Sequence, residues 1–315
     1  MPSSTARTFS DPDDYAAAIR QGTVETTITE RGCFNAKLIR IDLHCLWMQR
    51  LSENLPRILH VDGWGGRAII TFRTQTGPSL LHNGVELQPE NIVRLSAGQS
   101  FYQHSRGGVG FAGMSLPVAD MGSLGATMAG SELTPPRDTL IVTPPPGAMA
   151  KLQRLHAAAA HLAENAPEII ANASAAHGLE QELIEAMVGC VGTSEVHEDS
   201  VAQRQHELIM RRFRRVVEEN PEKPLYIPEI CKTIGVSERT LRVCCQEQLG
   251  VGPKRYLLFR RLHLARRALR KGLPDTTTVT EIATRYGFWH FGRFAGEYQS
   301  LFGEAPSSTL DRRAE

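Results

Sequence analysis

Residues 229–253 read EICKTIGVSERTLRVCCQEQLGVGP, and residues 281–306, EIATRYGFWHFGRFAGEYQSLFGEAP, repeat the same arrangement. Both copies open with Glu-Ile and reach a glycine six positions later, at Gly235 and Gly287. Both then end in an apolar residue and a glycine, with a proline three positions further on. Glycine adopts left-handed backbone without steric cost, so it can turn the chain sharply between two helices. Each copy therefore predicts a helix-turn-helix.

The second helix of the first copy has two distinct faces. Leu241, Cys245 and Leu249 recur every four residues and predict its buried side. Another face is rich in arginine and glutamine, which can make bidentate hydrogen bonds with guanine and adenine edges in the major groove. We expect this face to contact DNA, the alternative being an ordinary solvated surface. The candidate DNA-binding residues of this copy are the N-cap Ser237 and Arg239, Thr240, Arg242, Val243 and Gln246.

The tandem motif resembles the DNA-binding domain of the AraC/XylS family of bacterial transcription regulators. The resemblance rests on EIATRYGF, Phe294, Tyr298 and LFGEAP in the second copy, and it covers residues 204–311. It implies that the second helices of the two motifs enter successive major-groove segments on one side of double-stranded DNA. It also implies a transcription regulator that is not an enzyme, and an activator in contact with RNA polymerase.

The second copy departs from the family pattern on its DNA-facing side. The four equivalent positions are Gly292, Ala295, Gly296 and Gln299. The family most often has an arginine where this chain has Gly296, so we expect the first motif to carry more of the sequence discrimination. The remaining candidates for DNA contact in this copy are His290, Arg293 and Gln299. We expect Trp289 and Phe291 to pack at the turn.

A basic helix is predicted between the two motifs, at residues 254–271. Its 18 residues would rise about 27 Å, which suits two motifs that reach adjacent major grooves. From Arg204 onward the chain has 21 Lys and Arg against 13 Asp and Glu, a net charge of +8. The preceding residues have 14 against 21, or −7, so only the C-terminal part is expected to bind a polyanion. The residues expected to position it on phosphate, without reading sequence, are Arg255, Arg260, Arg266 and Arg267.

Residues 1–134 have the short alternating segments of a β-rich domain. Ile39, Ile41, Leu43 and Cys45 alternate with positions expected to face solvent, and Asn83-Gly84 predicts a two-residue hairpin. Strands without intervening helices favour an antiparallel sandwich or small barrel. The family resemblance implies a cupin-like barrel that binds a small effector, whose pocket residues the sequence does not identify. The predicted fold class is therefore a multidomain α+β protein.

We expect no metal site, cofactor or catalytic function in this β-rich domain. Its histidines His44, His60, His82 and His104 lack the His-X-His spacing of cupin metal sites. They either form hydrogen bonds in the core or line a pocket, and the sequence leaves both possibilities open.

Residues 135–203 are expected to form a helical connector and a polar linker. Two apolar stripes, at about 148–165 and 167–190, predict a helical pair. This pair either offers a homodimerisation surface or packs on its own barrel. The DNA-binding domain follows at 204–311, with its two motifs at about 228–249 and 279–302.

The six cysteines show no metal-binding spacing and are expected to be reduced thiols. One alternative is a thiol-based sensor or DNA-repair-type protein that uses Cys244 and Cys245, because a cation such as Arg242 lowers the pKa of a neighbouring thiol. A repressor without an effector is another. The chain shows no signal sequence and no apolar run of membrane-spanning length, so we expect a soluble cytoplasmic protein.

Overall fold

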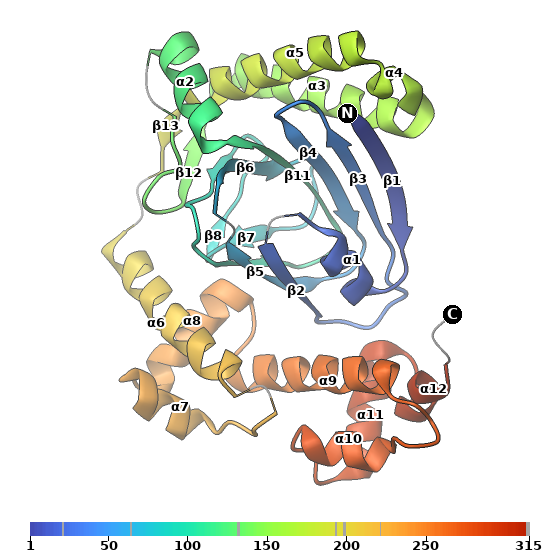
Figure 1. Ribbon diagram of the computed structural model, residues 1–315. Helices are drawn as coiled ribbons and strands as arrows, with labels where there is room; N and C mark the ends of the chain where they lie inside the picture. Colours follow the sequence, from blue (N-terminus) through green and yellow to red (C-terminus); the bar gives the residue numbers. More distant parts are fainter. Residues whose placement is uncertain are drawn as a thin grey trace.

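The computed structural model describes residues 1–20, 22–63, 65–130, 133–192, 194–197, 200–220 and 222–312. Its strands are β1 (Ser3–Phe9), β2 (Gly22–Ile28), β3 (Ala36–Asp42), β4 (Trp47–Glu53), β5 (Arg57–Gly63), β6 (Arg67–Arg73), β7 (Leu80–His82), β8 (Val85–Glu86), β9 (Ile92–Arg94), β10 (Phe101–Ser105), β11 (Val109–Pro117), β12 (Leu140–Thr143) and β13 (Glu195–Val196). Its helices are α1 (Pro12–Ala18), α2 (Val118–Ala129), α3 (Pro146–Asn165), α4 (Pro167–Ala171), α5 (Ala173–Gly192), α6 (Val201–Glu218), α7 (Ile227–Ile234), α8 (Glu238–Leu249), α9 (Pro253–Lys271), α10 (Val279–Arg285), α11 (Phe291–Phe302) and α12 (Pro306–Asp311). All of these strands precede α6 and form a sheet domain together with α1 to α5, whereas α6 to α12 form a C-terminal helical domain (Figure 1).

The sheet domain consists of two antiparallel sheets that face each other. The larger has the strand order β1-β3-β4-β11-β6-β9-β12-β13, and the smaller has the order β2-β5-β10-β7-β8. Each sheet keeps two edge strands in the described residues, so the pair is an open sandwich. The strand-rich prediction is confirmed, but the expected closed barrel is not found, because no ladder among the described residues joins the edges of one sheet to those of the other.

Apolar side chains fill the space on both sides of the larger sheet. Leu38 of β3 lies in the core between the sheets with Leu59 of β5 and Phe101 of β10. Its neighbour Ile39 points the other way, into a second core beneath α3 and α5. The sequence prediction that β3 buries only one face was therefore wrong, because the smaller sheet covers the face of Leu38, which was expected to meet water.

Helices α3, α4 and α5 lie together over the outer face of the larger sheet (Figure 1). Leu152 and Ala159 of α3 and Leu183 and Met187 of α5 are fully buried there. Of the two roles left open for this helical pair, packing on its own sheet is the one observed. The apolar stripes of α3 and α5, which could have formed a dimer surface, are buried against the larger sheet of the same chain.

A tight turn joins β7 to β8 where the sequence predicted a hairpin. Asn83 has φ 47° and Gly84 has φ 84°, the left-handed values that a two-residue turn of this kind requires. His82, just before the turn, stacks on Phe101 at 4.6 Å between ring centroids. Burial lowers the pKa of His82 to about 3, so this histidine is a neutral core residue.

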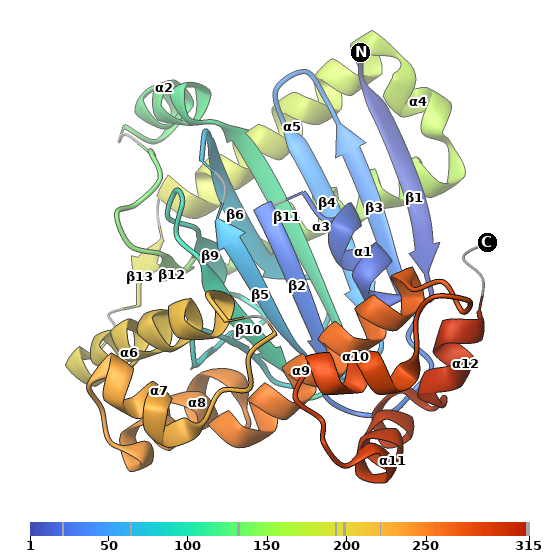
Figure 2. The same cartoon turned by 60° about the horizontal axis from the view of Figure 1, so that its bottom comes forward.

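The helical domain has two apolar cores, one for each predicted motif. The first unites α6, α7, α8 and the start of α9, and the second unites the rest of α9 with α10, α11 and α12. Figure 2 shows α9 running between the two halves and along the sheet domain. None of the described helices is both long enough and apolar enough to cross a membrane.

Candidate nucleic-acid interface

The first motif folds as its sequence predicts. Helix α7 ends at Gly235, which has the left-handed φ of 74°. Ser237 then caps α8, and its Oγ accepts a hydrogen bond of 3.1 Å from the backbone N–H of Thr240. Leu241, Cys245 and Leu249 are fully buried, as the four-residue spacing predicted.

The opposite face of α8 lies open to solvent. Ser237, Arg239, Arg242, Val243 and Gln246 are exposed, and Thr240 is half-buried. Gln246 uses its side-chain amide to donate a hydrogen bond of 2.8 Å to the Gly250 carbonyl at the end of the helix. The two arginines and Val243 therefore form a continuous exposed surface that a major groove could receive.

Removing the cap of α8 should destabilise the helical domain without touching its core. We expect Ser237→Ala to cost about 1 kcal/mol of unfolding free energy, because an amide at the start of α8 loses its acceptor. Urea unfolding of the DNA-free protein measures this. Ser300→Ala is the matched control, since Ser300 is an exposed residue within α11 and alanine is a better helix former. Equal midpoints for the two variants would contradict the capping role.

The cysteine pair of α8 does not have the environment of a reactive thiol. Cys244 and Cys245 are both fully buried. Burial, with the charge of Glu247, raises the pKa of the Cys244 thiol to about 11, and burial also raises the pKa of Cys245. The expected effect of Arg242 was therefore wrong, because that side chain points to solvent while the thiols point into the core. All six cysteines are free of disulfides.

The second motif has the same backbone but a different surface. Gly287 has φ 74°, and α11 follows with Phe294, Tyr298 and Leu301 buried. The proposed contact residues His290, Arg293 and Gln299 are all exposed, and Arg293 Nε donates to Glu297 Oε1 at 2.9 Å. Between them lie exposed glycines, so this face offers few side chains to a base edge.

Two aromatic residues at the start of α11 are more exposed than the sequence suggested. Trp289 is 65% exposed and Phe291 is 44% exposed. The prediction that both pack at the turn was wrong, because Phe288 occupies that place and stacks on Phe294 at 4.7 Å. Exposed aromatic rings next to His290 and Arg293 enlarge the surface with which this motif could meet a ligand or DNA.

Comparison with known proteins finds relatives of the C-terminal helical domain. Residues 230–312 match a family described as a helix-turn-helix domain. Two curated relatives are the "Probable thc operon regulatory protein" of Rhodococcus erythropolis, 44% identical, and the "XylDLEGF operon transcriptional activator 1" of Pseudomonas putida, 39% identical. Those alignments cover 30% and 32% of this chain and 28% and 31% of the relatives, so the chain matches less than a third of either one.

A solved structure is matched along almost its whole length. It is the crystal structure of a probable AraC family transcriptional regulator from Rhodopseudomonas palustris CGA009, 34% identical to this chain. The match covers 98% of that chain and 34% of this one, with a TM-score of 0.31. The present chain belongs to the AraC/XylS family.

In this AraC/XylS-family chain, the basic helix α9 faces the sheet domain. Arg266 donates to Asp11 at 2.7 Å, and Arg267 donates to Asp13 at 2.6 Å and to Glu25 at 2.8 Å. Arg270 pairs with Asp11 and with Asp14. We call these ion pairs between α9 and residues 11–25 the acidic clamp.

The acidic clamp changes the interpretation of the α9 arginines. Arg260 and Arg266 are buried and Arg267 is half-buried, so among the four predicted phosphate contacts only Arg255 is exposed. Arg266 and Arg267 are not available to DNA in this arrangement, because carboxylates of the sheet domain pair with them, and Arg260 is buried. Burial alone would raise the pKa of Asp11, but the charges of Arg266 and Arg270 outweigh it and hold that pKa below its usual range.

An apolar contact accompanies the clamp. Ile58 of β5 and Tyr102 of β10 point out of the smaller sheet into the core formed by α6 to α9, and Tyr102 meets Tyr256 edge to face at 6.4 Å. His60 and His104 are buried on the same strands. Burial and neighbouring arginines lower both histidine pKa values to about 4, so this interface contains neutral imidazoles.

Proposed function

We propose that this protein is a sequence-specific DNA-binding regulator of bacterial transcription, in which the exposed face of α8 supplies most of the base discrimination. The observation that carries the proposal is the exposed arginine-rich surface of a capped second helix in a tandem helix-turn-helix. Its DNA contacts would come from Ser237, Arg239, Thr240, Arg242, Val243 and Gln246, with His290, Arg293 and Gln299 contributing from the second motif. Double-stranded DNA is accordingly the first partner.

We assign effector sensing to residues 1–134, a connecting role to 135–203 and DNA binding to 204–311. The relatives' names support activation over repression, and an activator in the cytoplasm would contact RNA polymerase. A homodimer would have to form through a surface other than the buried stripes of α3 and α5. Neither an enzymatic activity nor a thiol switch through Cys244 and Cys245 is part of the proposal.

An effector would control DNA binding through the interface between the sheet domain and the helical domain. An effector shifts the equilibrium between two arrangements of these domains only if it binds one arrangement more tightly than the other. It must therefore contact groups whose positions differ between the two arrangements. A groove of about 970 Å³ meets this requirement, because residues 29–31 of the sheet domain, α9 and α11 all line it. Its apolar floor includes Leu258, Phe259 and Leu262. Its five cationic side chains outnumber the carboxylates Glu30 and Glu297; they are Arg31, Lys254, Arg255, Arg261 and Arg293. This lining favours an anionic ligand with an apolar body.

Selection of genomic fragments by the full-length protein tests the proposal. We expect recovery of a recurrent site with two half-contacts about 34 Å apart along the duplex, one helical turn. Binding of the recovered fragments at two salt concentrations separates sequence-specific from electrostatic affinity. Recovery of random fragments, all bound with the same strong salt dependence, would contradict sequence-specific regulation.

Arg255 provides a separate test of phosphate contact. It is exposed at the start of α9, where its guanidinium lies 5.1 Å from the Phe259 ring centroid. We expect Arg255→Ala to weaken cognate and unrelated duplexes alike and to lower the slope of log K against log salt by about 1. Arg154→Ala, an exposed arginine on α3, is the control and should leave the slope unchanged. A loss confined to the cognate site would assign Arg255 to base reading instead.

A further inference from the structure

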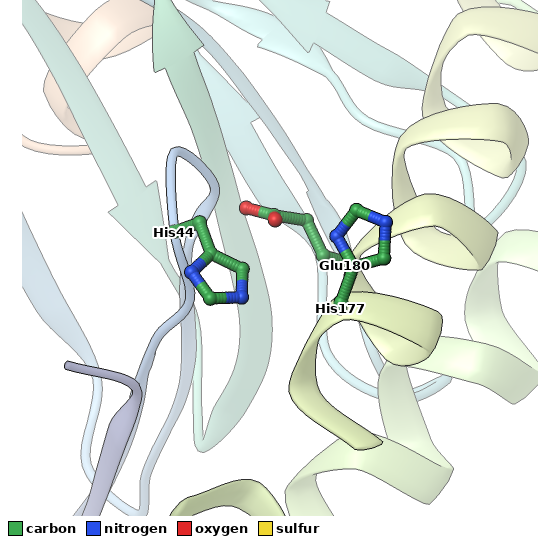
Figure 3. A group of neighbouring side chains, drawn as sticks. All are labelled: His44, His177 and Glu180. Carbon is green, nitrogen blue, oxygen red and sulfur yellow. The ribbon is translucent and has the colours of Figure 1, made fainter. Parts of the chain in front are cut away.

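Three potential metal ligands that are far apart in the sequence lie together at the top of the sheet domain. His44 is on the turn between β3 and β4, and His177 and Glu180 are on α5. One ligand atom from each residue lies within 4.8 Å of the other two. Figure 3 shows the Glu180 side chain extending from α5 toward the turn that carries His44.

The carboxylate of Glu180 is already fixed in place. Glu180 is 2% exposed, and its Oε1 accepts hydrogen bonds from the backbone N–H groups of Cys45 at 2.7 Å and Leu46 at 2.8 Å. Both backbone bonds use Oε1, and the Cys45 thiol is a further hydrogen-bond partner of Glu180, so the carboxylate still has lone pairs for a metal ion. A buried carboxylate held by second-shell donors is how proteins commonly orient a metal ligand.

Small side-chain rotations of His44 and His177 can bring their imidazoles into position to complete a set of three metal ligands with Glu180. His44 and His177 are exposed, with ring centroids 5.9 Å apart, so their rotamers are not locked by packing. In a tetrahedral zinc site with metal–nitrogen bonds of about 2.0–2.1 Å, neighbouring ligand atoms are about 3.4 Å apart. His177 and Glu180 are three residues apart on one helix, which places them on the same face. Only the His44 side chain has to approach from another element.

The charge near the site does not oppose a cation. Arg67 is the guanidinium close to the turn, and it donates hydrogen bonds to the carbonyls of Cys45 and Ser115. It also stacks over the Trp47 ring, with 3.8 Å from its Cζ to the ring centroid. Its charge is thereby committed to carbonyl oxygens and an aromatic face, whereas Glu180 directs a negative charge at the two imidazoles.

We propose that His44, His177 and Glu180 form a binding site for a divalent transition-metal ion of the zinc class, with the fourth position open to water or an external ligand. Two imidazoles and one carboxylate suit zinc and its neighbours in the first transition row, whereas magnesium and calcium prefer oxygen ligands alone. A bound ion would join the β3–β4 turn to α5 and stabilise the sheet domain. The site differs from the DNA-binding surface and does not depend on the proposed function.

Metal titration of the chelator-treated full-length protein tests this site. We expect one equivalent of Co²⁺ to bind with the visible absorption of a four-coordinate ion, and Zn²⁺ to displace it. His44→Asn and His177→Asn should each weaken binding at least about tenfold, because each removes a ligand. Both positions are exposed, so the variants should keep the metal-free melting temperature of the wild type. His161→Asn, an exposed histidine on α3, is the matched control and should bind like the wild type.

Thermal unfolding gives a second readout. Zn²⁺ should raise the melting temperature of the wild type and of His161→Asn, and should have no effect on the His44→Asn, His177→Asn double variant. Wild-type protein that binds no Co²⁺ or Zn²⁺ would overturn the proposal. Equal affinity of the wild type and both single variants would also overturn it, as would a sulfur-to-cobalt charge-transfer band that persists in them, since the ion would then be bound by cysteines.

Discussion

Replacing Asp11 and Asp13 by asparagine should release the α9 arginines and raise the affinity of the protein for DNA of any sequence. The side chains of Arg266 and Asp11 are each only 11% exposed. Removing one partner of a buried ion pair typically costs about 3–5 kcal/mol, and here it leaves a poorly compensated charge on Arg266, whose remaining contact is Glu304 at 3.7 Å. Separation of the two domains hydrates that charge, so we expect the cost to appear as an opened interface.

Asparagine is the appropriate replacement because Asp11 also caps α1. Its Oδ1 accepts hydrogen bonds from the backbone N–H groups of Asp13 and Asp14, and asparagine caps helices about as well as aspartate. The Asp11→Asn, Asp13→Asn variant should therefore keep α1 while losing the Asp11 and Asp13 pairs of the acidic clamp, so that only Arg267–Glu25 and Arg270–Asp14 remain of it.

Binding of a non-cognate duplex over a range of salt concentrations measures the release. Each arginine that gains a phosphate contact should steepen the salt slope by about 0.9. Glu86→Gln, Glu90→Gln is the control, because it changes the net charge equally at two exposed positions. A lower melting temperature with the DNA affinity and salt slope of this control would mean that the clamp only stabilises the fold and does not compete with DNA.

Arg242→Ala should have the largest effect on sequence discrimination. Arg242 is exposed on the outer face of α8, one turn from Arg239 and beside Val243. An arginine that makes a bidentate contact with guanine contributes about 1–3 kcal/mol of discrimination, so the variant should lose that affinity for the cognate site and tolerate substitution at one base pair.

Competition among operators mutated one base pair at a time measures this effect. Arg285→Ala is the matched control, because Arg285 is an exposed arginine of α10, outside the second helix of either motif. It should weaken all operators equally, if it weakens any. An unchanged order of preference in Arg242→Ala would remove this residue from the base-reading surface.

The sequence by itself determined the parts of this protein that depend on neighbours within one or two helical turns. The turn at Gly235, the Ser237 cap, the buried Leu241, Cys245 and Leu249, and the Asn83-Gly84 hairpin were all predicted correctly. Each follows from backbone sterics, local hydrogen bonding or side-chain periodicity, and these act over a few residues. The family resemblance rests on the same local features.

Only the tertiary structure decided which surfaces meet. The two sheets remain open, and α3 and α5 cover the larger one, so β3 buries both faces. Arg266 of α9 finds Asp11 at a separation of 255 residues, and His44 lies beside His177 and Glu180. Periodicity predicts which face of a helix or strand is polar and which is apolar, but it does not predict what covers each face. The covering element depends on the charge and shape of segments that are distant in the sequence. Arg266 and Arg267, which were expected on phosphate, are instead paired with carboxylates for this reason.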